Sequence, residues 1–405
     1  MILKKDLKAV LMKQQEDLKQ ELGIDRDISL KMLPKFATII SGVRRCGKST
    51  LARQYLRNTS TVYYIRFEDI GLTGFELNDF NKAEEVFNEM FGKGGIYFFD
   101  EIQNIEGWEN YIRQLIDRGE KVIITGSNAT MLSRELGTKL TGRHLSGELY
   151  PFSYNEFLKL RDSKHSLQLF DEYLGKGGFP EYLKTNDPSV MRNLSHDIFY
   201  RDIMQRNELR SETAIKMLLS YVISNIGKET SYNKLKDLTG VGSVNSVSQF
   251  IHHFEMAYML FELRKFEYSV KKQMVNPKKL YCVDNGLISQ NAFSFSENKG
   301  RMLENLVFLQ FKREGKELFY HRGRHECDFV IRGGTKIREA VQVCYELSSD
   351  NRSREIDGLM EAMETYVLKE GLLLTYDEED TVRMNNRTVT ILPVWKWILE
   401  QDSGS

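Results

Sequence analysis

The sequence predicts a multidomain α/β protein whose first large domain is a parallel sheet built around a phosphate-binding loop. The segment from Ser41 to Thr50, S-G-V-R-R-C-G-K-S-T, fits the pattern G-x-x-x-x-G-K-[ST]. A short apolar run at 35–41 precedes it, and apolar side chains follow at helical spacing over 51–56. A second apolar run, G-I-Y-F-F-D-E at 95–101, ends in two acids. Buried parallel strands have this continuous apolar pattern, and ligands bind where such strands end.

Length and charge limit the classes of function. A chain of 405 residues has material for two to four domains. Lys plus Arg and Asp plus Glu both number 57, so the formal net charge is zero. Any nucleic-acid surface must therefore be a local patch. The four cysteines lie far apart with no C-x-x-C pair, which indicates a reducing compartment and argues against a zinc site or disulfide framework. They are Cys46, Cys282, Cys327 and Cys344.

No apolar run approaches the length of a membrane span, and residues 1–20 are too charged for a secretory signal. We therefore expect a cytoplasmic protein without a membrane partner. Within residues 1–33, a leucine-rich stripe among charged residues predicts an amphipathic helix. The stripe comprises Leu3, Leu7, Val10, Leu11, Leu18 and Leu22. This helix is expected to pack on the nucleotide domain, and binding of a partner is the alternative.

The phosphate-binding loop predicts ATP and Mg²⁺ as cofactors. Its glycines let backbone N–H groups point at phosphate oxygens, and the following helix adds its positive N-terminal end. Lys48 would neutralise charge on the β- and γ-phosphates, and Ser49 would offer its hydroxyl to magnesium. The alternative, a glycine turn with an incidental lysine, does not explain the flanking strand and helix. The expected nucleotide contacts are Gly42, Val43, Arg44, Arg45, Cys46, Gly47, Lys48, Ser49 and Thr50.

The two acids after the second apolar run supply the rest of the expected chemistry. Asp100 would hold magnesium through water, and Glu101 would orient and polarise the attacking water as a base. The alternative is a core strand that ends in solvated acids. The strands predicted at 61–67 and 121–127 belong to the same sheet.

Two further polar residues are candidates for the nucleotide site. Asn128 follows the strand at 121–127 and could hydrogen-bond the γ-phosphate and the water, or it could be a turn residue or helix cap. Arg143 ends L-T-G-R before a strand predicted at 144–150. It could stabilise transition-state charge as an arginine finger, in cis or from a neighbouring subunit of a homo-oligomer. An ordinary surface arginine is the alternative.

These motifs resemble a known family. The chain is similar to archaeal-ATPase-like prokaryotic ATP-binding proteins, which are relatives of AAA+ and STAND ATPases. The motifs that carry this similarity are the Walker A and B residues, T-G-S-N, L-T-G-R, P-F-S-Y-N-E-F at 151–157 and G-G-F-P-E-Y-L at 177–183. The resemblance implies a P-loop NTPase sheet, a helical lid, a winged helix and a C-terminal restriction-endonuclease-like α/β domain. The expected divisions are 1–33 for the N-terminal helix, 34–155 for the ATPase core, 156–206 for the lid, 207–290 for the winged helix and 300–400 for the last domain.

The region 211–286 has the pattern helix, turn, helix and basic strands, which is typical of a winged helix. Asn245, Ser248 and Gln249 are polar near the start of its second helix, where groove-reading residues would lie. A hairpin is expected from 263–270 and 279–284, with Lys271, Lys272, Lys278 and Lys279 near its tip, available to DNA phosphates. Packing on the nucleotide domain or on a protein is the alternative.

The last domain resembles the PD-(D/E)xK nuclease core, with a helix at 301–313 and strands at 317–321, 326–331 and 340–347. Asp328 matches the aspartate of that family and Glu304 its helix glutamate. Gln342 stands at the acid position and Cys344 at the lysine position. A neutral amide is a poor magnesium ligand, and a thiol cannot replace an ammonium. We expect an inactive nuclease fold, in which Glu346 could compensate only in part.

The predicted function is magnesium-dependent ATP binding and hydrolysis coupled to conformational change in a DNA-associated role. One alternative is a STAND-like switch whose nucleotide state controls a protein partner. The other is an ATP-dependent nuclease.

Overall fold

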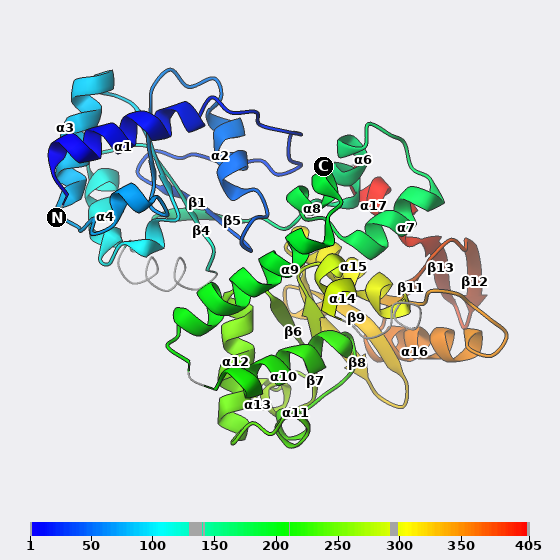
Figure 1. Cartoon of the computed structure of the whole chain (residues 1–405). Helices are drawn as coiled ribbons and strands as arrows, with labels where there is room; N and C mark the ends of the chain where they lie inside the picture. The colour runs from blue at the N-terminus through cyan, green and yellow to red at the C-terminus, as the bar shows by residue number, and fades with distance from the viewer. Residues whose placement is uncertain (1, 129–139, 141, 210, 292–298, 403–405) are drawn as a thin grey trace. The chain divides into compact units, whose positions relative to one another are not determined.

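The structure, a computed structural model, describes residues 2–128, 140, 142–209, 211–291 and 299–402. It divides into two compact units (Figure 1). Unit 1 comprises Met1–Tyr150 and Met256–Tyr258, and unit 2 comprises Pro151–Glu255 and Met259–Ser405. None of the helices in the described part is long and apolar enough to cross a membrane.

Unit 1 contains the predicted parallel sheet, whose strand order is β2-β3-β4-β1-β5. Every neighbouring pair is parallel, with Ala37 opposite both Val122 and His144. All carboxyl ends therefore lie along one edge, and the α/β fold class is confirmed. The strands are β1 (Ala37–Ser41), β2 (Val62–Arg66), β3 (Ile96–Asp100), β4 (Val122–Gly126) and β5 (His144–Glu148).

The first helix is shorter than predicted. The helices of unit 1 are α1 (Lys4–Asp17), α2 (Lys48–Leu56), α3 (Asp79–Phe91) and α4 (Trp108–Asp117), with 3₁₀ turns at Ile70–Leu72 and Ile102–Asn104. Residues 18–33 are not helical. Gln54 Nε2 donates to the carbonyls of Leu22 and Ile24 at 2.9 and 2.6 Å. The expected packing of α1 on the nucleotide domain is confirmed, since Leu7 and Leu11 are buried in its core.

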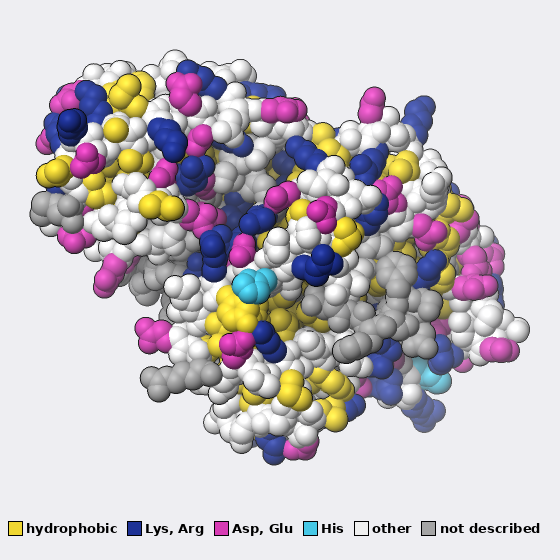
Figure 2. All heavy atoms as spheres, viewed as in Figure 1, with side chains coloured by type: hydrophobic (Ala, Val, Ile, Leu, Met, Phe, Trp, Pro, Cys, Tyr) yellow, Lys and Arg dark blue, Asp and Glu magenta, His cyan; other side chains and the backbone are white. Residues whose placement is uncertain are grey.

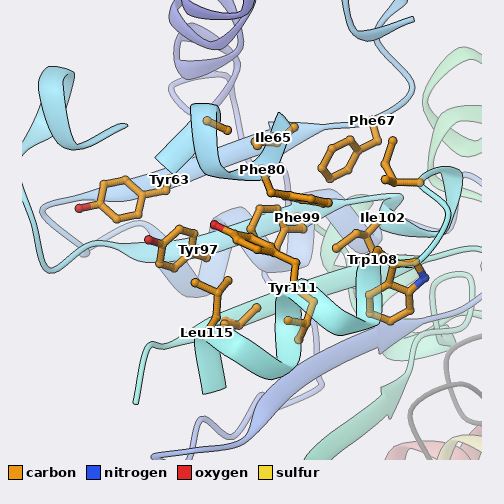
Figure 3. Close-up of a cluster of buried hydrophobic side chains, with 14 of the residues drawn as sticks. Tyr63, Ile65, Phe67, Phe80, Tyr97, Phe99, Ile102, Trp108, Tyr111 and Leu115 are labelled. Atoms are coloured by element: carbon orange, nitrogen blue, oxygen red, sulfur yellow. The ribbon is translucent and has the colours of Figure 1, made fainter. Parts of the chain in front are cut away.

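Aromatic side chains dominate that core (Figure 3). The ring of Phe80 stacks on Tyr111 at 4.3 Å and meets Phe99 edge-on at 5.8 Å. Tyr63 and Tyr97, on adjacent strands, are 4.9 Å apart. Such pairs add to the free energy gained by burying their area. Together they hold α3 and α4 against β2 and β3, which fixes the ends of those strands.

Unit 2 begins with a group of helices, and two of the sequence motifs found there form a helix cap and a close backbone contact. Ser153 and Glu156 form a capping box at the start of α6, since each side chain accepts from the backbone N–H of the other. Gly178 then allows a close backbone approach: its carbonyl accepts from Phe152 N at 2.7 Å. The helices of this part are α6 (Tyr154–Leu160), α7 (Leu167–Lys176), α8 (Pro180–Thr185), α9 (Pro188–Asp197) and the π-helix Ile198–Gln205.

Next come the helices and hairpin predicted for 211–286, with shifted boundaries. The elements are α10 (Glu212–Ser224), α11 (Tyr232–Thr239), α12 (Val244–Met256), β6 (Leu260–Arg264), α13 (Val270–Val275), β7 (Lys278–Cys282) and α14 (Asn285–Asn291). β6 and β7 pair antiparallel, as expected. The segment between them forms α13, so Lys271 and Lys272 lie on a helix. Lys278 and Lys279 lie within β7 rather than at a tip.

A six-stranded mixed sheet forms the rest of unit 2, in the order β12-β13-β11-β10-β9-β8. α16 packs on β9, β10 and β11, and Phe311 of α15 contacts both Phe329 and Trp397. The sheet therefore has a core of its own. The elements are α15 (Lys299–Arg313), β8 (Glu317–Arg322), β9 (Glu326–Gly333), β10 (Lys336–Val343), α16 (Arg352–Thr365), β11 (Glu370–Thr375), β12 (Asp380–Met384), β13 (Arg387–Pro393) and α17 (Val394–Asp402).

Substitution of Gly178 tests the close approach at the start of unit 2. A Cβ atom there would lie 2.2 Å from the Phe152 oxygen, so Gly178→Ala should lower the free energy of unfolding by about 1–3 kcal/mol. Gly242→Ala is the matched control, because nothing lies within 4 Å of its added Cβ. Urea denaturation of both variants measures the difference. Equal stabilities would contradict the tight packing at Gly178.

Candidate functional site

The phosphate-binding loop lies at the carboxyl edge of the parallel sheet, between β1 and α2. Gly42 has φ +155° and a Cβ there would lie 2.1 Å from the Leu149 oxygen, so only glycine fits. Gly47 precedes α2 with φ +103°, and α2 has no side-chain cap. The first N–H groups of α2 thus remain available to an anion.

Lys48 is buried at the centre of the site, with 4% of its surface exposed. Its Nζ donates to the carbonyls of Gly42 and Val43, both at 3.1 Å, and lies 3.4 Å from Glu101 Oε1. Burial is the largest influence on the pKa of Lys48 and would lower it, but the surrounding acidic groups, Glu101 first and then Cys46 and Asp100, together outweigh burial, and the pKa lies above its ordinary value. The lysine is therefore charged and held close to the loop.

Asp100 is the focus of a buried hydrogen-bond network. Its Oδ1 accepts from Ser49 Oγ at 2.8 Å and from the Thr125 hydroxyl, and its Oδ2 accepts from the Tyr64 hydroxyl at 3.2 Å. Burial, followed by the charge of Glu101, raises the pKa of Asp100. Tyr64 and Thr125 were not among the residues predicted for this site. Their signal was a hydroxyl within an otherwise apolar strand.

Glu101 adopts a left-handed backbone conformation with φ +55°, which costs free energy in a non-glycine residue. Its N–H donates to Thr125 Oγ1 at 3.0 Å, and Gln103 Nε2 donates to its Oε2 at 2.5 Å. Burial is the largest influence on the pKa of Glu101 and would raise it, but the Lys48 ammonium, the hydrogen bond from Gln103 and the Arg44 guanidinium together outweigh burial, and the pKa lies below its ordinary value. Glu101 is therefore a fixed carboxylate beside Lys48.

The residues present fit a magnesium–nucleotide complex. Ser49 and Asp100 offer oxygen atoms, which magnesium prefers, and the uncapped start of α2 suits phosphate. Within the described ranges, no group of three or more His, Cys, Asp or Glu side chains is placed to hold a metal.

Other residues lie around the loop. Arg44 forms an ion pair with Glu68 at 2.8 Å, and Arg26 Nη1 donates to the Cys46 carbonyl at 2.8 Å. Arg26 was not predicted, because it lies outside any motif. Asn128 is buried and follows β4 at the carboxyl edge, where a γ-phosphate contact requires it to be. Its role stays a prediction.

Arg143 lies at the wrong edge of the sheet for a role in cis. It immediately precedes β5, whose first residue pairs with the first residue of β1, so it lies at the amino edge. The loop is at the opposite edge, about 16 Å away along a five-residue strand. Arg143 Nη2 instead pairs with Asp117 Oδ1 at 2.8 Å. The expected cis arginine finger is therefore wrong, whereas action from a neighbouring subunit stays a prediction.

The lysines predicted to contact DNA divide into two pairs. Lys271 and Lys272 are exposed on α13, and Asn245 is exposed and Ser248 half-buried on α12. Lys278 and Lys279 are buried, because they lie inside the β6–β7 pair. The prediction that these two contact DNA phosphates is therefore wrong.

The predicted nuclease-like residues come together in unit 2. Glu304 and Asp328 both bind Lys279, and Gln342 Oε1 accepts from Asp328 N at 3.0 Å. Cys344 follows the end of β10 and is half-buried, and burial raises its pKa to about 11. Glu346 is exposed and lies beyond the end of β10, so it does not share a strand face with Gln342, and the expected partial compensation is wrong.

The chain is similar to known proteins along nearly its whole length. It is 34% identical to the uncharacterized protein MJ1544 of Methanocaldococcus jannaschii, over 96% of this chain and 94% of that protein. The chain belongs to the MJ1544 family. A family model described as AAA domain matches residues 34–158, and a domain of unknown function (DUF8612) matches 167–297. The AAA match confirms the general class of the first large domain.

A second relative is an uncharacterized protein of Haemophilus influenzae, 28% identical over 90% of this chain and 94% of the relative. Among solved structures, the Orc1 protein of Aeropyrum pernix in complex with DNA has a TM-score of 0.27 and 11% identity, over 71% of this chain and 90% of that one. That similarity is too low to support an argument about this member of the MJ1544 family.

Gly42→Ala tests the loop of this AAA domain. The added Cβ would collide with the Leu149 carbonyl, so the loop should shift and ATP affinity should fall at least about tenfold, or 1.4 kcal/mol. Gly74→Ala is the control, because it has a positive φ like Gly42 but nothing within 4 Å of its Cβ. Titration with a fluorescent ATP analogue measures both. Unchanged affinity in Gly42→Ala would contradict the assigned loop geometry.

Proposed function

We propose that unit 1 binds ATP with Mg²⁺ and hydrolyses it. The observation that carries this proposal is the paired arrangement of Ser49 with Asp100 and of Lys48 with Glu101 at one edge of the sheet. The AAA domain is, in general terms, an ATPase-type domain, and its match covers all four residues. A bound ATP would supply the phosphoryl group, and magnesium would shield its charge.

Each side chain then has one role. With ATP and magnesium bound, Lys48 would exchange its two carbonyl partners for phosphate oxygens, and Ser49 and Asp100 would hold the metal and its water. Thr125 and Tyr64 position the Asp100 carboxylate. Glu101 orients and polarises the attacking water. Since Lys48 lowers the pKa of Glu101, movement of the lysine toward phosphate makes the carboxylate a stronger base.

Two substitutions separate binding from hydrolysis. Lys48→Ala removes the buried ammonium and should weaken ATP binding about 10- to 100-fold. Glu101→Gln should retain binding but lower kcat by about 10²- to 10⁴-fold. The exposed neighbour Glu106→Gln is the control and should keep normal turnover. Steady-state phosphate release and equilibrium binding measure both. Normal turnover by Glu101→Gln would remove that residue from its assigned role.

We further propose that nucleotide state reaches the region predicted as a winged helix. Met256–Tyr258 belong to unit 1, although the residues on both sides along the chain belong to unit 2. The Tyr258 hydroxyl donates to Ser41 Oγ at 2.8 Å, next to Gly42. A shift of the loop would thus be passed through Tyr258 along the chain to α12 and β6.

The proposed target of this change is DNA. Asn245 and Gln249 are exposed on α12, and Lys271 and Lys272 are exposed on α13, so they offer base-edge and phosphate contacts. Positive and negative side chains are interspersed over the visible face (Figure 2), which agrees with a local rather than a general basic surface. A protein partner is the second candidate, because apolar side chains beside these lysines are exposed. They are Tyr268, Val270, Met274 and Val275.

DNA stimulation of ATP hydrolysis discriminates between these targets. We expect duplex, single-stranded or branched DNA to raise turnover at low salt, and the effect to fade as salt rises. Substituting both Lys271 and Lys272 by alanine should weaken the stimulation at least about tenfold. The matched control replaces the exposed Lys5 and Lys13 on α1. Turnover that no DNA changes would favour the protein-directed switch.

A further inference from the structure

A buried lysine stands at the centre of the nuclease-like residues. Lys279 of β7 is 1% exposed, and its Nζ lies 2.6 Å from Glu326 Oε1, 2.8 Å from Asp328 Oδ1 and 3.0 Å from Glu304 Oε1. The three acids come from α15 and β9, so the lysine reaches them from a different sheet. We call Lys279, Glu304, Glu326 and Asp328 the carboxylate centre.

Two of the carboxylates accept hydrogen bonds from the Lys279 ammonium, and the third forms an ion pair with it. Lys279 Nζ donates to Asp328 Oδ1 at 2.8 Å and to Glu304 Oε1 at 3.0 Å, and it lies 2.6 Å from Glu326 Oε1. Charge-assisted bonds of this kind are short and strong where the charged groups are buried, as Lys279 and Asp328 are. The pKa of Lys279 is raised well above its ordinary value, since its carboxylate neighbours outweigh its burial. The lysine is therefore a permanent cation within the centre.

The oxygens around the centre are used by the protein itself. Tyr281 donates to Glu304 Oε1 at 2.6 Å, and Val343 N donates to Asp328 Oδ2 at 3.1 Å. Gln342, at the position of the missing acid, donates to Glu355 Oε2 at 2.7 Å. Magnesium needs near-octahedral oxygen ligands. Little of this shell remains for a metal.

We propose that Lys279 is an internal counter-ion that takes the place of a divalent metal in the carboxylate centre. The last domain then neither binds a catalytic metal nor cuts nucleic acid. This inference goes beyond the ATPase proposed for unit 1 and does not depend on it.

The β6–β7 pair, which carries Lys279, is also hydrogen-bonded to the six-stranded sheet. Phe266 N donates to the Tyr320 carbonyl at 2.9 Å, and the Tyr320 hydroxyl donates to the Pro277 carbonyl at 2.6 Å. These bonds and the ion pairs join the β6–β7 pair to β8 and β9. The hairpin and the six-stranded sheet therefore behave as one body, with Lys279 as the buried link between them.

Replacing Lys279 in the full chain tests whether its ammonium group occupies the place of a divalent metal. Lys279→Met keeps most of the side-chain volume but frees three carboxylates, so the variant should gain a Mn²⁺ site that binds at least about tenfold more tightly than any in the unmodified protein. Electron paramagnetic resonance titration of Mn²⁺ without nucleotide measures this. Lys278→Met is the matched control, because the Lys278 Nζ donates to the carbonyls of Met274 and Asn276 and lies over the Tyr232 ring, so its loss frees no carboxylate of the carboxylate centre. It should gain nothing.

Adding Asp328→Asn to Lys279→Met should remove the gained site. The proposal is overturned if the unmodified protein binds Mn²⁺ at a site that Asp328→Asn abolishes, or if folded Lys279→Met gains no site. If Lys279→Met does not fold, the proposal is tested on the native chain by measuring the rate of acetylation of each lysine with mass spectrometry. Lys279 should react at least about tenfold more slowly than the exposed Lys271, and equal reactivity would overturn the proposal.

Discussion

The buried charges at the carboxyl edge of the parallel sheet are the constraint on which unit 1 depends. Lys48, Asp100 and Glu101 are all removed from water, and each is costly unless partnered. Ser49, Thr125 and Tyr64 supply those partners to Asp100, while Lys48 and Glu101 compensate each other. The strand order, the aromatic core and the strained backbone of Glu101 all serve to hold these groups within a few ångströms.

The sequence predicted that Lys48, Ser49, Asp100 and Glu101 lie near one another, because local context places each of them. A strand end and a glycine loop position Lys48 and Ser49, and the end of a continuous apolar run positions Asp100. Arg143 shows the limit of such reasoning. Whether a residue beside a strand lies at the amino or carboxyl edge depends on register and direction, and here β5 runs parallel to β1 from its first residue. Tyr64 and Thr125 were missed for a related reason, since their roles depend on adjacent strands.

In unit 2 the sequence predicted the antiparallel pair β6–β7 and the run α15, β8, β9 and β10, but not α13 and not which side chains are buried. Four lysines near one predicted hairpin looked equivalent, yet Lys279 is enclosed by acids that lie 25 to 49 residues away along the chain. Likewise, Gly178 and Asp284 meet through a bond of 2.6 Å across 106 residues. Contacts between residues so far apart along the chain leave no local pattern in the sequence. Such contacts bring Glu304, Glu326 and Asp328 around Lys279 in the carboxylate centre.

Equilibrium binding of ATP to the unmodified chain, with and without Mg²⁺, tests the central claim most directly. The arrangement of Ser49 and Asp100 predicts that ATP binds and that Mg²⁺ tightens the binding, while removal of the metal with a chelator weakens it again. ATP binding that is absent, or that is indifferent to Mg²⁺, would contradict the account of the site.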